Sequence, residues 1–261
     1  MTQGDAGGTK LAVKAATKRY GDFHALKDCS LDIGANSVVS IVGPSGCGKT
    51  TLLWAMSGLN PLTSGEVLLD GTPIDRPRPE VGLVFQEANL LPWRNLMDNI
   101  LFPFEIKRQQ PDRAWIDHLL DRVSLKGFEK SFPNELSGGM QQRGSIVRAL
   151  SLQPSVLLMD EPFGALDAFT REEMNQLVEE IWLETKTTIV FITHSIEEAL
   201  FLSDQVVVLT PRPGRVLNVY DVPFERPRTM EIMASKEVFD LTNQIKADIY
   251  GQQIAGRAAA E

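Results

Sequence analysis

The fold of this chain is decided by Gly43-Pro44-Ser45-Gly46-Cys47-Gly48-Lys49-Thr50, which matches the pattern G-x-x-x-x-G-K-[ST]. The apolar run 38–42 precedes it and is typical of a buried strand, whereas residues 51–56 after it favour a helix. In this context the glycines let backbone N–H groups point inward, and the helix N-terminus adds its positive end. Lys49 is expected to reach the β- and γ-phosphates, and the Thr50 hydroxyl is expected to bind Mg²⁺. The stretch therefore predicts a nucleoside triphosphate site rather than a plain Gly-rich turn.

This phosphate loop, residues 43–50, supplies most of the expected nucleotide contacts. Its residues, with the next one along the chain, are Gly43, Pro44, Ser45, Gly46, Cys47, Gly48, Lys49, Thr50 and Thr51. Cys47 is expected to contribute no chemistry of its own, although alkylation of its thiol should block nucleotide by bulk.

Length and composition limit the size and the class of protein that this chain can be. A chain of 261 residues can bury a sizeable core as one large α/β domain or two small ones. The net charge of -8 argues against nucleic-acid binding, because a phosphate backbone requires a basic face. No apolar run is long enough to cross a bilayer, and polar, Gly-rich residues 1–10 are expected to form a flexible tail. Cys29 and Cys47 are expected to be reduced thiols of a cytosolic protein.

Apolar patterning predicts several strands. Alternating residues between 11 and 33 favour antiparallel strands with one wet face. Residues 67–69, with the turn Asp70-Gly71, and residues 81–85 favour two more. More continuous runs are typical of buried parallel strands: 156–159, 189–192 and 206–209.

Helical periods dominate between residues 90 and 150, with the best helices at 114–123 and 140–150. This block is expected to be a helical insertion between two strands. A second helical pattern predicts a stripe that faces the core, and the chain is expected to finish in an amphipathic helix around 238–249. The residues of the stripe are Phe169, Met174, Leu177, Val178, Ile181 and Trp182.

A second motif narrows the range of reactions that a nucleotide-binding chain could catalyse. In Leu136-Ser137-Gly138-Gly139-Met140, Ser137 is a good N-cap, and the glycines leave backbone N–H groups open to an anion. Shortly afterwards, an apolar run ends in Asp160, a pattern typical of a strand whose tip holds Mg²⁺ through water. Glu161 follows, placed to accept a proton from an attacking water. Separately, these motifs could be an ordinary helix start and a solvated turn; together they indicate nucleotide hydrolysis.

With these motifs the chain strongly resembles the ATP-binding subunits of ABC transporters over about residues 11–215. The resemblance implies that Tyr20 stacks on adenine and that Gln86 contacts Mg²⁺ or water and faces the membrane subunit. It also implies that Ala165-Leu166-Asp167 forms a D-loop across a subunit boundary, and that His194 contacts the γ-phosphate. On this basis the catalytic residues are expected to be Glu161, His194, Gln86 and Lys49, with Mg²⁺ held by Thr50, Gln86 and Asp160.

The resemblance also implies an architecture. We expect an α/β P-loop ABC ATPase with a RecA-like mixed-sheet core, an antiparallel β subdomain and an inserted α-helical subdomain at about 90–155. The ATPase domain would span 11–215, and residues 216–261 would form a short C-terminal extension. In this family, the helix after Ser137 binds the γ-phosphate held by the Lys49 loop of another copy. Two ATP molecules are thus sandwiched in a homodimer, which acts as a switch biased by nucleotide.

The chain is most similar to importers made of separate subunits. Residues 87–95 are apolar and aromatic enough to dock a permease helix, although they could instead fold onto the chain's own helical block. Leu90-Leu91-Pro92-Trp93 and Thr210-Pro211-Arg212-Pro213-Gly214-Arg215 resemble the nitrate, sulfonate and taurine branch. We therefore expect a peripheral subunit at the cytoplasmic face of the inner (cell) membrane, with permease subunits and, indirectly, a solute-binding protein as partners. Alternatives are an importer for a vitamin or pyrimidine precursor or another organic solute, and a soluble non-transport ABC ATPase. No function follows from the sequence for Gly144.

Overall fold

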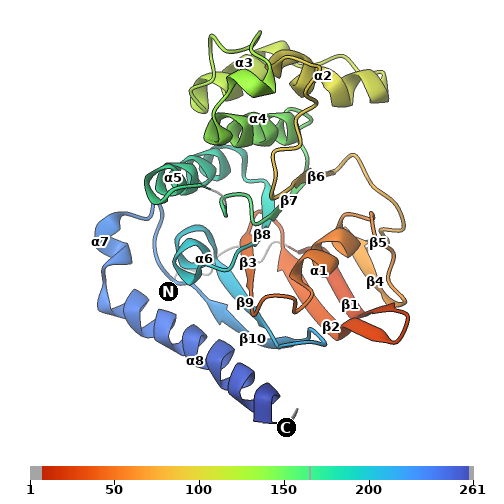
Figure 1. Ribbon diagram of the computed structural model, residues 1–261, viewed down its shortest axis with the longest axis vertical. Coiled ribbons are helices and arrows are strands. Elements are labelled where there is room, and N and C mark those ends of the chain that lie inside the picture. The colour runs from red at the N-terminus through yellow and green to blue at the C-terminus, as the bar shows by residue number, and fades with distance from the viewer. Residues whose placement is uncertain (1–7, 165, 259–261) are drawn as a thin grey trace. The chain divides into compact units, whose positions relative to one another are not determined.

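The computed structural model describes residues 8–164 and 166–258, with side chains described as far as Gly251 (Figure 1). The predicted tail residues 1–7 and Ala165 of the predicted D-loop lie outside the described residues. The chain combines helices with parallel and antiparallel strands, which confirms an α/β fold. The chain divides into two compact units, one of residues up to Arg78 together with those from Lys186 onward, the other Pro79–Thr185.

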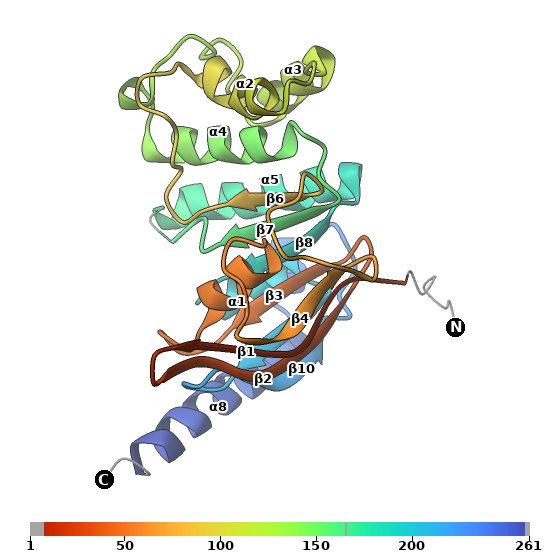
Figure 2. The same cartoon turned by 90° about the vertical axis from the view of Figure 1, so that its right-hand side faces the viewer.

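The first unit contains an antiparallel sheet, of which β1, β2 and β4 are labelled in Figure 2. Its order is β2-β1-β4-β5, and β1 pairs antiparallel with both β2 and β4, as the alternating pattern predicted. The bounds are β1 (Thr9–Tyr20), β2 (Phe23–Gly34), β4 (Ser64–Leu69) and β5 (Thr72–Pro73). Thr9 and Lys10, expected in the tail, belong to β1. They join the strand because they pair with the residue that follows β4. The Asp70 N–H donates to the Lys10 carbonyl at 2.9 Å, and Lys10 Nζ lies 2.7 Å from Asp70 Oδ2.

The same unit holds strands of a mixed sheet in the order β10-β9-β3-β8. Both β8 and β9 run parallel to β3, and β10 pairs antiparallel with β9. Every residue of β3 and β8 is buried, as expected for parallel strands covered on both faces. The bounds are β3 (Val38–Val42), β8 (Thr188–Ile192), β9 (Gln205–Leu209) and β10 (Val216–Asp221), with helices α1 (Lys49–Met56) and α6 (Ile196–Leu202).

The C-terminal segment forms α7 (Met230–Met233) and α8 (Lys236–Ala258), so the expected final helix is present and is longer than the pattern indicated. Figure 1 shows α8 running past the β9–β10 edge. Val238 and Ile245 of α8 are buried in one cluster with α6 and β9. Buried Arg228, between β10 and α7, holds this segment against α6, because its Nη1 donates to the carbonyls of Leu200 and Phe201 at 2.6 and 2.9 Å.

The second unit contains two parallel strands and most of the helices. The strands are β6 (Val81–Val84) and β7 (Val156–Asp160). The helices are α2 (Leu96–Lys107), α3 (Arg113–Arg122), a 3₁₀ turn η1 (Pro133–Glu135), α4 (Gly138–Leu150) and α5 (Ala168–Thr185). The helices expected at 114–123 and 140–150 correspond to α3 and α4. Helix α2 lies inside the block in which helical periods were expected, although it was not one of the two best-marked helices. It contains Pro103, and Asn95 caps its start by accepting the Asp98 N–H at 2.8 Å.

The stripe expected on α5 is buried except at one position. Met174, Leu177, Val178, Ile181 and Trp182 are buried, whereas Phe169 is 83% exposed. The expectation for Phe169 was wrong because it precedes Met174 by five residues, which rotates its side chain by about 140° around the helix.

Gly144 has a packing role. A Cβ added there would lie 2.7 Å from Cδ1 of Leu96, so the missing side chain lets α4 approach α2 closely. Alanine would favour the helix backbone but would crowd a buried leucine. The glycine is therefore explained by close helix packing within the second unit.

Candidate nucleotide-binding site

The phosphate loop connects buried β3 to α1, the context that its pattern predicted. Gly48 has a φ of 101°, and a Cβ there would lie 2.8 Å from the Ala25 carbonyl oxygen, so this position requires glycine. Lys49 is only 6% exposed. Its Nζ donates to the carbonyls of Gly43 and Pro44 at 3.0 and 3.2 Å, which holds the ammonium against the loop. A buried cation within a Gly-rich loop at a helix N-terminus fits a polyphosphate.

Three loops of the first unit leave the same sheet edge. Register pairs Ile41 with Ile192 and Val42 with Val208, so the carboxyl ends of β3, β8 and β9 are adjacent. The phosphate loop follows β3, His194 follows β8, and residues 210–215 follow β9. Ligands of open α/β sheets bind at such an edge. The structure thus brings His194, which is exposed, to the side of the sheet that carries the phosphate loop.

Hydrogen bonds fix the turn that carries His194. Thr193 Oγ1 lies 2.5 Å from Glu198 Oε2, and it accepts the Ser195 N–H at 3.0 Å. Ser195 caps α6 by accepting the Glu198 N–H at 3.2 Å. Thr193 and Glu198 are both buried. Glu198 thus supports the turn, a role that sequence reasoning missed because a glutamate in a helix pattern is ordinarily a solvated residue.

Tyr20 ends β1 with its side chain 48% exposed. Its hydroxyl accepts a hydrogen bond from Asn60 Nδ2 at 2.5 Å, and Lys18 Nζ lies 5.1 Å from the ring centroid. The ring is therefore held in place while much of it remains accessible, which suits stacking on a nucleotide base.

In the second unit, Gln86, Asp160 and Glu161 come together at one strand edge. Parallel β6 and β7 pair Val84 with Met159, so the residues that follow these two positions emerge side by side. Asp160 is buried at the end of β7. Glu161 has a φ of 43°, a left-handed conformation that is uncommon for a glutamate. Such backbone outliers cluster at functional sites, so the conformation itself marks Glu161 as a candidate.

The signature turn, residues 136–140, begins α4 as predicted. Ser137 Oγ accepts the Met140 N–H at 3.3 Å. A Cβ added at Gly138 would meet nothing within 4 Å, whereas one added at Gly139 would lie 3.1 Å from Thr170 Cγ2, so the turn is open beside Gly138. Gln141 Nε2 donates to the carbonyls of Pro133 and Leu136 at 2.9 and 3.1 Å and thereby fixes the approach to the helix. The open turn can admit an anion.

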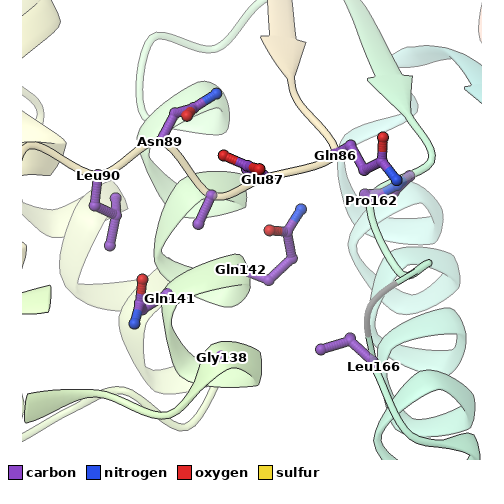
Figure 3. A pocket seen from close by; sticks show the side chains of 10 residues that line it. Gln86, Glu87, Asn89, Leu90, Gly138, Gln141, Gln142, Pro162 and Leu166 are labelled. Atoms are coloured by element: carbon purple, nitrogen blue, oxygen red, sulfur yellow. The ribbon is translucent and has the colours of Figure 1, made fainter. Parts of the chain in front are cut away.

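A cavity of about 440 Å³ lies in this unit, between the start of α4 and the residues that follow β6 and β7. Figure 3 shows Gln141 and Gln142 projecting from α4, with the Gln86 segment, residues 86–90, above them and Pro162 and Leu166 across from them. The lining residues are Gln86, Glu87, Ala88, Asn89, Leu90, Gly138, Gln141, Gln142, Pro162 and Leu166.

Helix α4 fastens the Gln86 segment through backbone carbonyls. Buried Gln142 donates from Nε2 to the Phe85 carbonyl at 3.1 Å. Arg148 donates to the carbonyls of Ala88 and Asn89 at 3.0 and 2.9 Å, and burial lowers the pKa of its guanidinium. The segment after Gln86 and the signature turn are therefore attached to one helix.

Asp167 of the predicted D-loop caps α5. Its Oδ1 accepts the N–H groups of Phe169 and Thr170, both at 3.1 Å. The Thr170 hydroxyl donates to Oδ2 at 2.7 Å, and these bonds hold the pKa of the Asp167 carboxyl below its usual value. The capping places exposed Phe169 directly beside the predicted D-loop.

The oxygen ligands of the chain suit Mg²⁺ shared with a nucleotide. Among residues 8–164 and 166–258, no group of three or more His, Cys, Asp or Glu side chains could hold a metal ion. Mg²⁺ ordinarily takes one or two protein oxygens together with substrate phosphates and water. In the second unit, Asp160 at the end of β7 offers one such oxygen, and in the first unit Thr50 at the start of α1 offers another. In the described part of the chain, no helix combines the length and apolarity needed to span a membrane.

Sequence comparison relates the chain to known proteins. A family model described as ABC transporter matches residues 26–164. The taurine import ATP-binding protein TauB of Rhizobium johnstonii is 44% identical over 250 residues, which cover 92% of this chain and 95% of that protein. The nitrate import ATP-binding protein NrtD of Synechococcus elongatus is 44% identical over 81% of this chain and 79% of that protein.

Solved structures of ATP-binding cassettes are also similar to this chain. The post-hydrolysis dimer of the ATP-binding cassette MJ0796 with ADP and Pi is similar with a TM-score of 0.72 and 32% identity, covering 82% of this chain and all of that one. The cbiO1 protein of Clostridium perfringens, part of the ABC transporter complex cbiONQ, has a TM-score of 0.75 and 29% identity, covering 90% of this chain and 95% of that one.

Proposed function

Because the chain belongs to the ABC transporter family, we propose that it is the ATP-hydrolysing subunit of an importer that powers uptake of a small solute through a separate membrane permease. The observation that carries this proposal is the phosphate loop with Lys49 buried against it, at the sheet edge that also bears His194. Similarity to proteins named for taurine and nitrate import favours a solute of that class. A vitamin or pyrimidine precursor, or another organic solute, remains the alternative cargo.

The site residues receive roles that follow the chemistry of their positions. Tyr20 stacks on adenine, and the phosphate loop with Thr51 binds the phosphates through N–H groups and Lys49. Thr50, Gln86 and Asp160 hold Mg²⁺, partly through water, and the metal neutralises phosphate charge. Glu161 accepts the proton of the attacking water, and His194 contacts the γ-phosphate.

A homodimer completes the site. We assign the open turn at Ser137, Gly138 and Gly139 to the γ-phosphate bound by a second copy, so two nucleotides lie between two chains. The similar MJ0796 cassette is described as dimeric with ADP and Pi, which supports this arrangement. We propose that the chain consists of an ATPase domain of residues 11–215, with a helical subdomain near 90–155, and a C-terminal extension of 216–261.

The membrane partner is proposed to dock beside the cavity of the second unit. The Gln86 segment lines that cavity, and Trp93, which follows it, is 71% exposed. Tryptophan is enriched among the residues that dominate binding at protein interfaces, so an exposed tryptophan three residues beyond this segment suits a docking surface. The chain would lie at the cytoplasmic face of the cell membrane, and a solute-binding protein would be an indirect partner.

A pull-down tests the transport role. Tagged Glu161→Gln chain is captured from solubilised membranes with ATP and Mg²⁺, and the bound proteins are identified by mass spectrometry. We expect a polytopic permease, and any solute-binding protein captured with it is screened against taurine, nitrate, other sulfonates and pyrimidines. Recovery of soluble ribosomal or nucleic-acid proteins alone would replace the importer with a non-transport ABC ATPase.

A matched pair of variants locates the docking surface. Trp93→Ala should lose the permease while ATP binding is unchanged. Phe128→Ala removes another exposed aromatic side chain of the same unit, 41% exposed, and should keep the permease. Equal recovery with both variants would place the docking surface elsewhere.

A further inference from the structure

One arginine beyond the predicted site touches the phosphate loop. Arg212, in the loop after β9, donates from both Nε and Nη2 to the carbonyl oxygen of Gly46, at 3.2 Å each. Its Cζ lies 4.4 Å from the centroid of the Phe23 ring, close enough for a cation–π contact. Phe23 begins β2 and pairs in register with Tyr20. Arg212 therefore links the hairpin that carries Tyr20 to the phosphate loop.

The loop that carries Arg212 is itself firmly placed. The Thr210 hydroxyl accepts the Arg215 N–H at 3.1 Å and donates to the Pro213 carbonyl at 3.0 Å. The Gly214 N–H donates to the Ala25 carbonyl at 3.0 Å. A Cβ at Gly214 would overlap the carbonyl oxygen of Cys47, so this loop and the phosphate loop are in direct backbone contact. Arg212 thus projects from a fixed base.

Peptide geometry gives the contact a consequence for ligands. In a planar trans peptide the C=O and the following N–H point in opposite directions. Because Arg212 holds the Gly46 carbonyl, the Cys47 N–H is directed away from Arg212, and it makes a long bond of 3.3 Å to the Pro44 carbonyl inside the loop. A guanidinium on the carbonyl also polarises the peptide and strengthens the N–H as a donor. The contact therefore fixes the orientation of the Gly46–Cys47 peptide within the loop.

We propose that Arg212 is a positioning residue of the nucleotide site, which holds the phosphate loop in its phosphate-binding form. This inference rests on the proposed ATPase function. Because the contact is made to the loop and not to a reacting atom, loss of Arg212 should weaken ATP and ADP by the same factor. It should raise the KM for ATP and leave kcat within about twofold.

The test measures nucleotide affinity and steady-state kinetics on the full-length chain. Arg212→Ala should raise the Kd of both ATP and ADP by about 5- to 20-fold, the range expected for charge-assisted hydrogen bonds at a partly exposed site. Arg212→Lys should recover only part of the affinity, because an ammonium lacks the planar fork. Arg215→Ala is the matched control, since it removes the same charge from the same exposed loop and should change Kd by less than about twofold.

A second variant separates positioning from net charge. Phe23→Leu removes the ring under the guanidinium and should weaken binding less than Arg212→Ala does, with no further loss when the two are combined. Three results would overturn the inference: Arg212→Ala matching Arg215→Ala, a loss in kcat with unchanged Kd, or additive effects of Phe23→Leu and Arg212→Ala. Failure of the unmodified chain to bind ATP would instead overturn the proposed function.

Discussion

Asn99 supports the loop that carries Trp93, and its replacement should show how strongly. The side chain is fully buried on α2. Its Oδ1 accepts the Leu91 N–H at 2.6 Å. Its Nδ2 donates to the carbonyls of Leu91, Arg94 and Asn95 at 3.2, 3.0 and 3.0 Å. One amide therefore closes residues 91–95 into a compact turn next to the proposed docking surface.

Asn99→Ala should lower the free energy of unfolding by about 2–4 kcal/mol. Each buried polar group left without a partner costs about 1–3 kcal/mol, and a small cavity adds to that loss. The full sum over four bonds is not expected, because Leu91, Arg94 and Asn95 are only partly buried and water can replace some of the bonds. For a chain of this size the melting temperature should fall by roughly 5–15 °C.

The measurement is urea unfolding followed by tryptophan fluorescence, together with permease capture and ATP turnover. We expect lower stability and weaker capture, with turnover by the isolated chain largely retained. Asn134→Ala is the matched control, because Asn134 is an exposed asparagine of the same unit, and its loss should cost less than about 0.5 kcal/mol. A cost below about 1 kcal/mol for Asn99→Ala would refute the reasoning that this amide holds the turn.

Further expectations concern catalysis, the cysteines and α5. Glu161→Gln should slow phosphate release by about 100-fold or more while ATP binding persists, and a normal rate would remove Glu161 as the base. Lys49→Ala should weaken ATP binding by at least about tenfold, so unchanged affinity by titration would contradict the loop assignment. Burial raises the pKa of the Cys29 thiol to about 11, so the reactive thiolate is scarce at pH 7. Maleimide labelling of the native chain, followed by mass spectrometry, should be slow and should accelerate about tenfold per pH unit from pH 7 to 9, whereas equal rates in folded and unfolded chain would contradict burial. Phe169→Ala should cost less than about 1 kcal/mol in thermal unfolding and Met174→Ala about 2–5 kcal/mol; equal costs would contradict the exposure of Phe169.

Cys47 shows how the structure changes one expectation of the sequence. Its thiol is buried and burial raises its pKa. Alkylation, expected to block nucleotide by bulk, therefore requires the phosphate loop to open first. The two thiols are free, in line with the prediction of reduced cysteines.

Short sequence patterns predicted the features that depend on residues close together in the sequence. The phosphate loop, the capped start at Ser137 and the apolar strand runs each carry their signal within a few residues, and the structure forms them at the expected places. Helix α2 lies in the block expected to be helical, but its bounds were not predicted, because Pro103 inside it weakens the local helix pattern.

Contacts between residues far apart in the sequence leave no comparable pattern in the sequence. Arg148 reaches carbonyls about sixty positions away, and Arg212 reaches Gly46 across 166 positions. Both are ordinary surface cations in a sequence pattern, and only the folded backbone brings acceptors to them. Residues that position a site were therefore missed even where the residues of the site itself were predicted.

Helix α4 connects two functional parts of the second unit. Its 13 residues form a rod about 20 Å long, with the signature turn at one end and, through Gln142 and Arg148, the Gln86 segment fastened along its side. A displacement of that segment must therefore either break these bonds or move α4, and the Ser137 end with it.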